Sequence, residues 1–189
     1  MIHTREKQDD LWLVTNTLAG DNLAFQVLIE RHHGVIFAVV RGVLGDHPDL
    51  DETVQNVIIR IYGGLSRFRG DAKFSSWAYR VARNEAVSSV SRRQLPHVPL
   101  ESIEEPGHRY GDPEAAYWRG VEDRQLEQVM SGLEENYRII LELRYMGERS
   151  YLEIAEIMDL PLGTVKTTLF RAKAQLKSLW ERRILKATG

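Results

Sequence analysis

Apolar residues along this chain recur mainly at the three- and four-residue spacing of amphipathic helices, and the alternating pattern of strands is scarce. In the first half, this pattern predicts one helix from Asp21, a good N-terminal cap, to Leu44. A second helix is predicted from about residue 49 to the glycine pair at 63–64, and a third over residues 74–92. Short turn-forming segments separate these helices, so the first half of the chain is predicted to be a helical domain.

Residues 94–118 have a different composition from the rest of the chain. They hold four of the six prolines, two glycines and five acidic residues. Such a segment is typical of an extended, flexible linker. The helical pattern resumes after residue 119. We therefore predict an all-α fold of two small helical domains, residues 1–93 and 119–189, joined by an acidic, Pro-rich linker at 94–118.

The sharpest local pattern lies in residues 150–180. A first short helix has four apolar positions on one face: Tyr151, Ile154, Ala155 and Met158. Residues 159–163 read as a tight turn, and Thr164 is predicted to cap the next helix. That helix buries Val165, Leu169, Ala172 and Leu176 on one face. Two helices joined by so short a turn predict a helix-turn-helix.

The opposite face of the second helix is basic, and it carries Lys166, Thr167, Phe170, Arg171, Lys173 and Lys177. A basic outer face on the second helix is typical of a helix that reads the DNA major groove. Phe170 is informative because an aromatic ring on a cationic, wet face needs a cover, such as thymine methyl groups or a protein partner. The alternative is an amphipathic helical hairpin whose basic face is merely solvated.

Residues 65–93 interleave aromatic and basic side chains. This pattern is typical of single-stranded nucleic-acid binding, because rings stack on exposed bases while cations hold the backbone. Trp77, Val81, Asn84 and Ser88 share one helical face. An alternative stays open, in which Phe74 and Trp77 are core residues and Asn84 is an ordinary surface amide.

The net charge of −2 and the isoelectric point of about 6.3 argue at first against a nucleic-acid binder. The charge is unevenly distributed, however. Residues 60–93 hold 8 basic and 2 acidic residues, and residues 164–189 hold 7 and 1, so each segment has a net charge of +6. Charge separation of this kind indicates localised polyanion contacts, unless these are ordinary solvated faces.

Two further observations exclude function classes. The chain has no cysteine, which excludes disulfides, thiolate catalysis and cysteine-based zinc sites. The longest uninterrupted apolar run, residues 35–40, is too short to cross a bilayer, and residues 1–14 lack a signal-peptide pattern. We therefore expect no direct membrane insertion.

Taken together, three segments resemble the extracytoplasmic-function (ECF) class of bacterial RNA polymerase sigma factors. They are DLDETVQNVIIRIY at 49–62, LSRFRGDAKFSSWAYRVARN at 65–84 and SYLEIAEIMDLPLGTVKTTLFRAK at 150–173. They occur in the family's order, and the resemblance covers nearly the whole chain. It implies that residues 1–93 are sigma domain two and residues 119–189 are sigma domain four.

The resemblance also implies a role for each segment. The first would dock on the clamp helices of the polymerase's largest subunit, through Asp51, Glu52, Gln55 and Asn56. The second would open the −10 promoter element and capture a flipped base, through Phe68, Arg69, Gly70, Asp71, Lys73, Trp77, Arg80, Asn84 and Ser88. The third would enter the major groove at the −35 element, through Thr164, Lys166, Thr167, Phe170, Arg171 and Lys173. Residues 133–145 would lie against the polymerase flap.

The expected partners are core RNA polymerase, promoter DNA (double-stranded at −35, single-stranded at −10) and an anti-sigma factor. No catalytic residue, cofactor, metal or small-molecule substrate is expected, because the polymerase supplies the chemistry. The expected location is the cytoplasm, where a membrane-anchored anti-sigma factor would hold the protein at the membrane.

Three departures from the family's pattern bear on specificity. Asn56 stands where the family commonly has an acidic residue. Lys166 and Thr168 each stand where the family frequently has an arginine. Lysine cannot make the bidentate guanine contact of arginine. These changes affect the expected polymerase contact and promoter preference.

Two rival functions remain at this stage. A stand-alone helix-turn-helix regulator would use the same recognition helix, but it leaves the aromatic and basic segment 65–84 unexplained. A metal-dependent helical hydrolase would use the nitrogen and oxygen ligands in residues 32–52. Against it, His32 and His33 point to different helical faces, and no HExxH-like spacing occurs.

Overall fold

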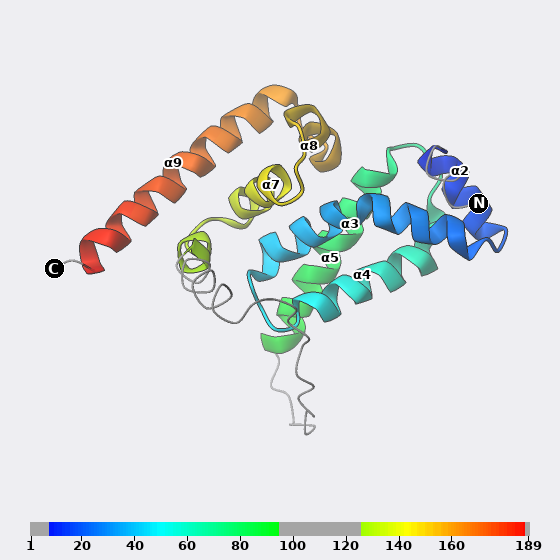
Figure 1. Ribbon diagram of the computed structural model, residues 1–189, viewed down its shortest axis with the longest axis horizontal. Helices are drawn as coiled ribbons and strands as arrows, with labels where there is room; N and C mark the ends of the chain where they lie inside the picture. Colours follow the sequence, from blue (N-terminus) through cyan, green and yellow to red (C-terminus); the bar gives the residue numbers. More distant parts are fainter. Residues whose placement is uncertain (1–7, 95–125, 188–189) are drawn as a thin grey trace, which may run out of the picture.

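The computed structural model describes residues 8–94 and 126–187, and within these ranges it contains helices and no strand (Figure 1). The predicted all-α fold is confirmed. The N-terminal half holds α2 (Asp10–Leu18), α3 (Asn22–Leu44), α4 (Leu50–Gly64), the short 3-10 helix η1 (Leu65–Arg67) and α5 (Phe74–Gln94). Residues 126–130 are helical, followed by α7 (Glu135–Tyr145), α8 (Tyr151–Met158) and α9 (Leu162–Ala187). The predicted linker lies almost wholly outside the described residues.

The helices of the N-terminal half follow the sequence pattern closely. Asp21 caps α3 as predicted, because its carboxylate accepts from the backbone N–H groups of Leu23 and Ala24. In α4 Val54 and Val57 lie on the inner face and are buried. Helix α2 was not predicted. Its start is marked by Asp9, which caps it, and its inner face is buried against α3.

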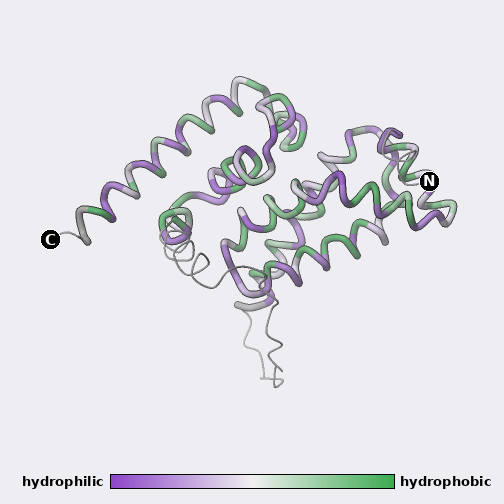
Figure 2. Tube along the Cα trace, in the orientation of Figure 1, coloured by the Kyte–Doolittle hydropathy of each residue, from purple (hydrophilic) through white to green (hydrophobic). Residues whose placement is uncertain are grey.

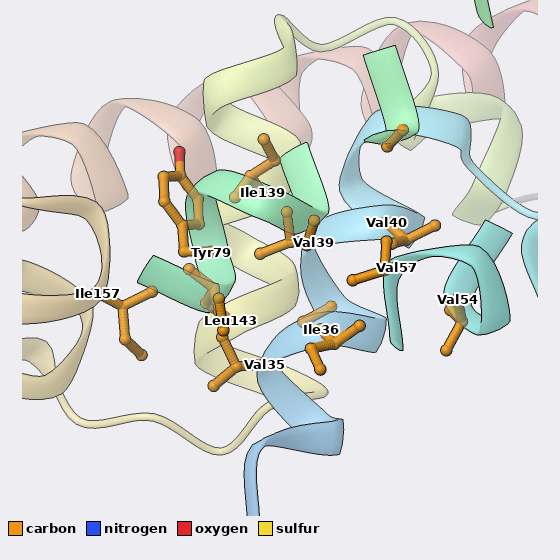
Figure 3. Close-up of a cluster of buried hydrophobic side chains, with 14 of the residues drawn as sticks. Val35, Ile36, Val39, Val40, Val54, Val57, Tyr79, Ile139, Leu143 and Ile157 are labelled. Atoms are coloured by element: carbon orange, nitrogen blue, oxygen red, sulfur yellow. The ribbon is translucent and has the colours of Figure 1, made fainter. Parts of the chain in front are cut away.

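Helix α3 is the centre of the fold, and it packs against α2, α4, α5 and α7. Its apolar face includes Val35, Ile36, Val39 and Val40, which lie at the middle of the buried cluster in Figure 3. Among the described residues, it is the one helix long and apolar enough to cross a membrane. Half of its most apolar stretch is buried within the fold. The position of α3 in the core therefore explains its apolar sequence.

The C-terminal half packs directly on the N-terminal half. Helix α7 lies along α3, and α8 contacts α5. Figure 3 shows Ile139, Leu143 and Ile157 meeting residues of α3 and α5 in one continuous buried cluster. Gly42 permits the close approach, because a Cβ atom there would lie 2.7 Å from the Cα atom of Ile139. The domain limits given above stay a prediction, and the described parts of both halves share a core.

Helix α9 runs along α7 and α8 at its beginning, and its C-terminal part extends away from the body of the molecule (Figure 1). Hydrophilic and hydrophobic residues alternate in bands along it (Figure 2). Such banding is the signature of a helix with one face packed and the other in solvent.

Candidate nucleic-acid interface

The predicted helix-turn-helix is formed by α8 and α9. Ser150 and Glu153 make a reciprocal capping box that starts α8. Hydrogen bonds from the backbone and side chain of Ser150 lower the pKa of the Glu153 carboxyl. Asp159 ends α8 in the left-handed conformation, with φ 55° and ψ 50°. The start and end of α8 are therefore set by local features of the sequence, the capping box and the left-handed residue Asp159.

One detail of the prediction was wrong. Thr164 does not cap α9, because the helix already begins at Leu162 and the N–H of Val165 donates to the carbonyl of Pro161. Proline is well suited to a helix start, since its missing N–H would have no partner there. The turn is therefore shorter than predicted, and Thr164 is exposed in the first turn of the helix.

The two faces of α9 are divided as predicted as far as Ala172, whereas Leu176, also predicted to be buried, is half-buried. Val165, Leu169 and Ala172 are buried, while every predicted DNA-contacting residue of this helix is exposed: Thr164, Lys166, Thr167, Phe170, Arg171 and Lys173. Phe170 is 75% exposed, so its ring has no cover within the described residues. Thr167 uses its hydroxyl to donate to the carbonyl of Gly163. The surface that α9 presents is therefore cationic with one aromatic ring at its middle.

Lys173 is held by a neighbouring helix. Its ammonium lies 5.5 Å from the ring centre of Tyr145 on α7. A side-chain hydrogen bond with Tyr145 raises the pKa of Lys173, so this residue keeps its positive charge. The arrangement orients the ammonium at the edge of the recognition surface.

A groove of about 310 Å³ lies between α4 and α5. The predicted −10 residues Trp77, Asn84 and Ser88 line it together. An aromatic ring, an amide and a hydroxyl on one wall can stack on a base and read its polar edge. Gly64 lies opposite, and a Cβ there would be 3.2 Å from the Trp77 ring, so the glycine makes room for the indole.

The two aromatic residues Phe74 and Trp77 differ in burial. Phe74 is a core residue with 1% exposure. Trp77 is half-buried, and its ring centre lies 5.5 Å from those of both Phe68 and Phe74. Phe74 therefore supports the ring from behind, while Trp77 faces the groove.

The loop before α5 forms a separate depression. Gly70 has a φ of 77°, a conformation that favours glycine. Arg69 and Asp71 flank it as an exposed ion pair at 3.3 Å. Phe68, Gly70, Asp71 and Lys73 line this depression together with residues of α2. The predicted −10 residues thus divide between this loop, the groove, and Arg80, which faces the C-terminal half.

Several groove residues were missed by the sequence reasoning. Arg60 and Arg67 contribute two cations to its lining, and Glu85 contributes a carboxylate. Glu85 is 3% exposed and pairs with Arg60 and with Arg92, the latter at 2.7 Å. The basic count of residues 60–93 included these arginines, but helical spacing alone does not place α4 beside α5.

The predicted polymerase-binding residues share the outer face of α4. Asp51, Glu52 and Gln55 are exposed, and Asn56 is half-buried. The face continues into two exposed apolar side chains that were not predicted, Ile59 at 67% and Tyr62 at 52%. Apolar residues rimmed by carboxylates are typical of a protein-binding surface.

The two halves meet at residues of the predicted DNA surfaces. Lys73 pairs with Glu156 at 2.6 Å, and Ser76 donates to the carbonyl of Glu156 at 2.6 Å. Asn84 and Thr164, predicted to read different promoter elements, line one cleft of about 460 Å³ between α5 and α9. In this arrangement the two surfaces lie side by side.

The histidines of the metal hypothesis have other roles. His32 is buried, and its Nε2 lies 2.8 Å from the carboxylate of Asp10. His47 lies 3.7 Å from Asp49. Among the described residues, no group of three or more His, Asp or Glu side chains is arranged to hold a metal ion.

Comparisons with known proteins agree on one family. The chain matches Sigma-70 region 2 over residues 28–95 and Sigma-70, region 4 over residues 123–176. It is 35% identical to the ECF RNA polymerase sigma-E factor of Escherichia coli over 179 residues, which cover 89% of this chain and 92% of the relative. It is 32% identical to the RNA polymerase sigma-H factor of Pseudomonas aeruginosa over 176 residues, which cover 88% and 91%.

Two solved structures share the fold. One is CnrH in complex with the cytosolic domain of CnrY, with a TM-score of 0.64, 20% identity, and coverage of 92% of this chain and 97% of that chain. The other is the sigma factor RpoE in complex with the anti-sigma factor NepR from Bartonella quintana, with a TM-score of 0.55, 20% identity, and coverage of 82% and 95%.

Proposed function

Because the chain belongs to the ECF class of RNA polymerase sigma factors, we propose that it binds core RNA polymerase and directs transcription initiation at specific promoters. The α9 surface reads the −35 element as duplex DNA. The groove between α4 and α5 holds a base of the opened −10 element. The observation that carries this proposal is the groove, where Trp77, Asn84 and Ser88 converge beside two arginines.

The chemistry of these surfaces is recognition, and no bond is broken. Strand opening has an unstacking cost, which a pocket for the extruded base offsets. Stacking on Trp77 contributes about 1–3 kcal/mol with little sequence information, so the choice of base falls on polar groups such as Asn84. The protein acts as an initiation factor, and the polymerase supplies catalysis.

The outer face of α4 is the proposed polymerase contact. Asp51, Glu52 and Gln55 provide its polar part, and Ile59 and Tyr62 extend it with apolar area. Asn56 has no charge and cannot form the ion pair that a carboxylate would, so Ile59 and Tyr62 add apolar contact area of a different kind. The protein works in the cytoplasm with the polymerase, and an anti-sigma factor holds it inactive. One structural neighbour, the sigma factor RpoE in complex with the anti-sigma factor NepR, supports this last point.

The central experiment is transcription in vitro with purified protein and core polymerase. We expect promoter-specific transcripts, and we expect Asn84→Ala and Arg171→Ala each to reduce them about tenfold or more. Asn22→Ala and Arg182→Ala are matched controls, because both residues are exposed and neither belongs to the proposed surfaces. Failure of the protein and core polymerase to co-elute on a sizing column would contradict the proposal.

The stand-alone regulator is tested by the same reagents without polymerase. A sequence-specific footprint of the purified protein alone on duplex DNA would favour that function. The proposed function predicts a footprint that requires core polymerase.

A further inference from the structure

We propose that Glu85 is a positioning residue for single-stranded promoter DNA, because it holds Arg60 and Arg92 beside the groove as phosphate-binding groups. The inference rests on the proposed function of the groove. It assigns a role to a buried carboxylate that lines the groove and lies outside the apolar core.

The burial of Glu85 requires its partners. Its side chain is 3% exposed, whereas those of Arg60 and Arg92 are 57% and 53% exposed. An unpaired carboxylate at this depth would be strongly disfavoured. One carboxylate therefore anchors two guanidinium groups, and the cluster retains a net positive charge that faces solvent.

The geometry leaves most of each guanidinium available. Oε1 of Glu85 accepts a hydrogen bond from a terminal nitrogen of Arg92, whereas Oε2 forms an ion pair with Nε of Arg60 and has no hydrogen-bond partner among the described residues. A guanidinium has five N–H donors in a rigid fork, so the remaining donors can bind a second acceptor. Two phosphate oxygens of a strand in the groove fit this requirement, because phosphate is the acceptor that arginine forks match best.

The cluster lies where a strand must pass. Arg60 itself lines the groove with Trp77 and Asn84. Arg92 stands one helical turn after Ser88, another groove residue, on the same helix. Anchoring fixes the rotamers of both arginines before DNA binds, which lowers the entropy lost on binding. The groups that bind the base and those that bind the DNA phosphates are therefore held at fixed positions relative to one another.

Replacing Glu85 with a neutral residue distinguishes this role from a net-charge effect, because the two predict changes in DNA affinity of opposite sign. Removal of a negative charge next to DNA strengthens binding if only net charge matters. If Glu85 positions the arginines, Glu85→Gln weakens binding instead. Glu30→Gln is the matched control, because Glu30 is an exposed glutamate that does not line the groove.

The test measures binding by the assembled holoenzyme. The probe is a fluorescent single-stranded oligonucleotide that wild-type holoenzyme enriches from a randomised library. We expect Glu85→Gln to weaken binding at least about fivefold and Glu30→Gln to leave it unchanged. In the background of Arg60→Ala and Arg92→Ala, Glu85→Gln should no longer weaken binding, because its weakening effect runs through those residues.

A second set of variants tests the proposal if Glu85→Gln does not fold. Thermal unfolding shows whether Glu85→Gln is folded; if it is not, Arg60→Lys and Arg92→Lys replace it. Both keep the charge but lose the fork, so we expect each to weaken binding at least about threefold. Equal binding by these lysine variants, or equal or tighter binding by folded Glu85→Gln, overturns the proposal for Glu85.

The proposed function fails in a different way. If wild-type holoenzyme enriches no oligonucleotide, or if Asn84→Ala binds the enriched probe as tightly as wild type, the groove is not a −10 site. If Asn84→Ala loses binding to the enriched probe while Glu85→Gln keeps it, the groove remains the proposed −10 site and only the role of Glu85 is refuted.

Discussion

Glu142 is a carboxyl group buried between the two halves of the molecule, on α7. It is 8% exposed, and its Oε1 lies 3.8 Å from Nε of Arg41. Its Oε2 has no hydrogen-bond partner among the described residues. Both groups line a cavity of about 440 Å³, together with Asp46, Glu127 and Arg138. Burial raises the pKa of Glu142, with Arg41 opposing the rise and Asp46 adding to it.

A pH dependence of stability follows from that direction. Because the folded pKa of Glu142 lies above its ordinary value of 4.5, the group stabilises the fold below that pH. This contribution is lost as the pH rises through the folded pKa. We expect Glu142→Gln to raise the melting temperature at neutral pH, by ~2–4 °C for each kcal/mol gained, and the gain to vanish toward pH 4.5. A lower melting temperature of this variant at neutral pH would mean that the ion pair with Arg41 outweighs burial.

At the scale of elements, α9 was predictable almost in full because its two faces alternate at helical spacing. Its first residue was not, since Pro161 and Leu162 read as turn residues. Helix α2 was missed although its capping residue and apolar positions are plain, because the segment is only nine residues long. Local patterns therefore predict the body of a helix better than its ends.

The division of α9 into two faces makes a paired prediction. Leu169→Ala should lower the free energy of unfolding by about 2–5 kcal/mol, because Leu169 is 1% exposed. Phe170→Ala should change it by no more than ~0.5 kcal/mol, because the ring is in solvent. Phe170→Ala should nevertheless weaken holoenzyme binding to a duplex −35 element several-fold. Equal duplex binding by wild type and Phe170→Ala would show that the ring serves another partner.

At the scale of the whole molecule, the proposed function requires both surfaces to reach one promoter, which the described arrangement does not allow. The two elements lie about 25 base pairs apart, or roughly 85 Å along straight duplex DNA. Residues from both surfaces line a single cleft here. The proposed function therefore predicts that the halves separate for initiation, with loss of the Arg83–Glu135 ion pair at 2.6 Å and of the hydrogen bond from Arg138 to the carbonyl of Gly42 at 2.8 Å.

Gly42 offers a direct test of this requirement. A Cβ atom at this position would lie 2.7 Å from Ile139, so Gly42→Ala should lower the free energy of unfolding by about 1–3 kcal/mol and increase the radius of gyration measured by X-ray scattering. Gly63→Ala is the matched control, because its Cβ meets no atom within 4 Å and should stabilise helix α4 slightly. A Gly42→Ala protein with unchanged radius would contradict the expected opening.

The sequence by itself determined most of the helices, the helix-turn-helix and the family, because these depend on spacing between residues close together in the chain. Only the tertiary structure decided which side chains meet from distant segments. Arg60 and Glu85 are paired across two helices, and Arg138 bonds to the backbone of α3, 96 residues away. Such contacts depend on how helices pack, and helical spacing within one element carries no information about its neighbour.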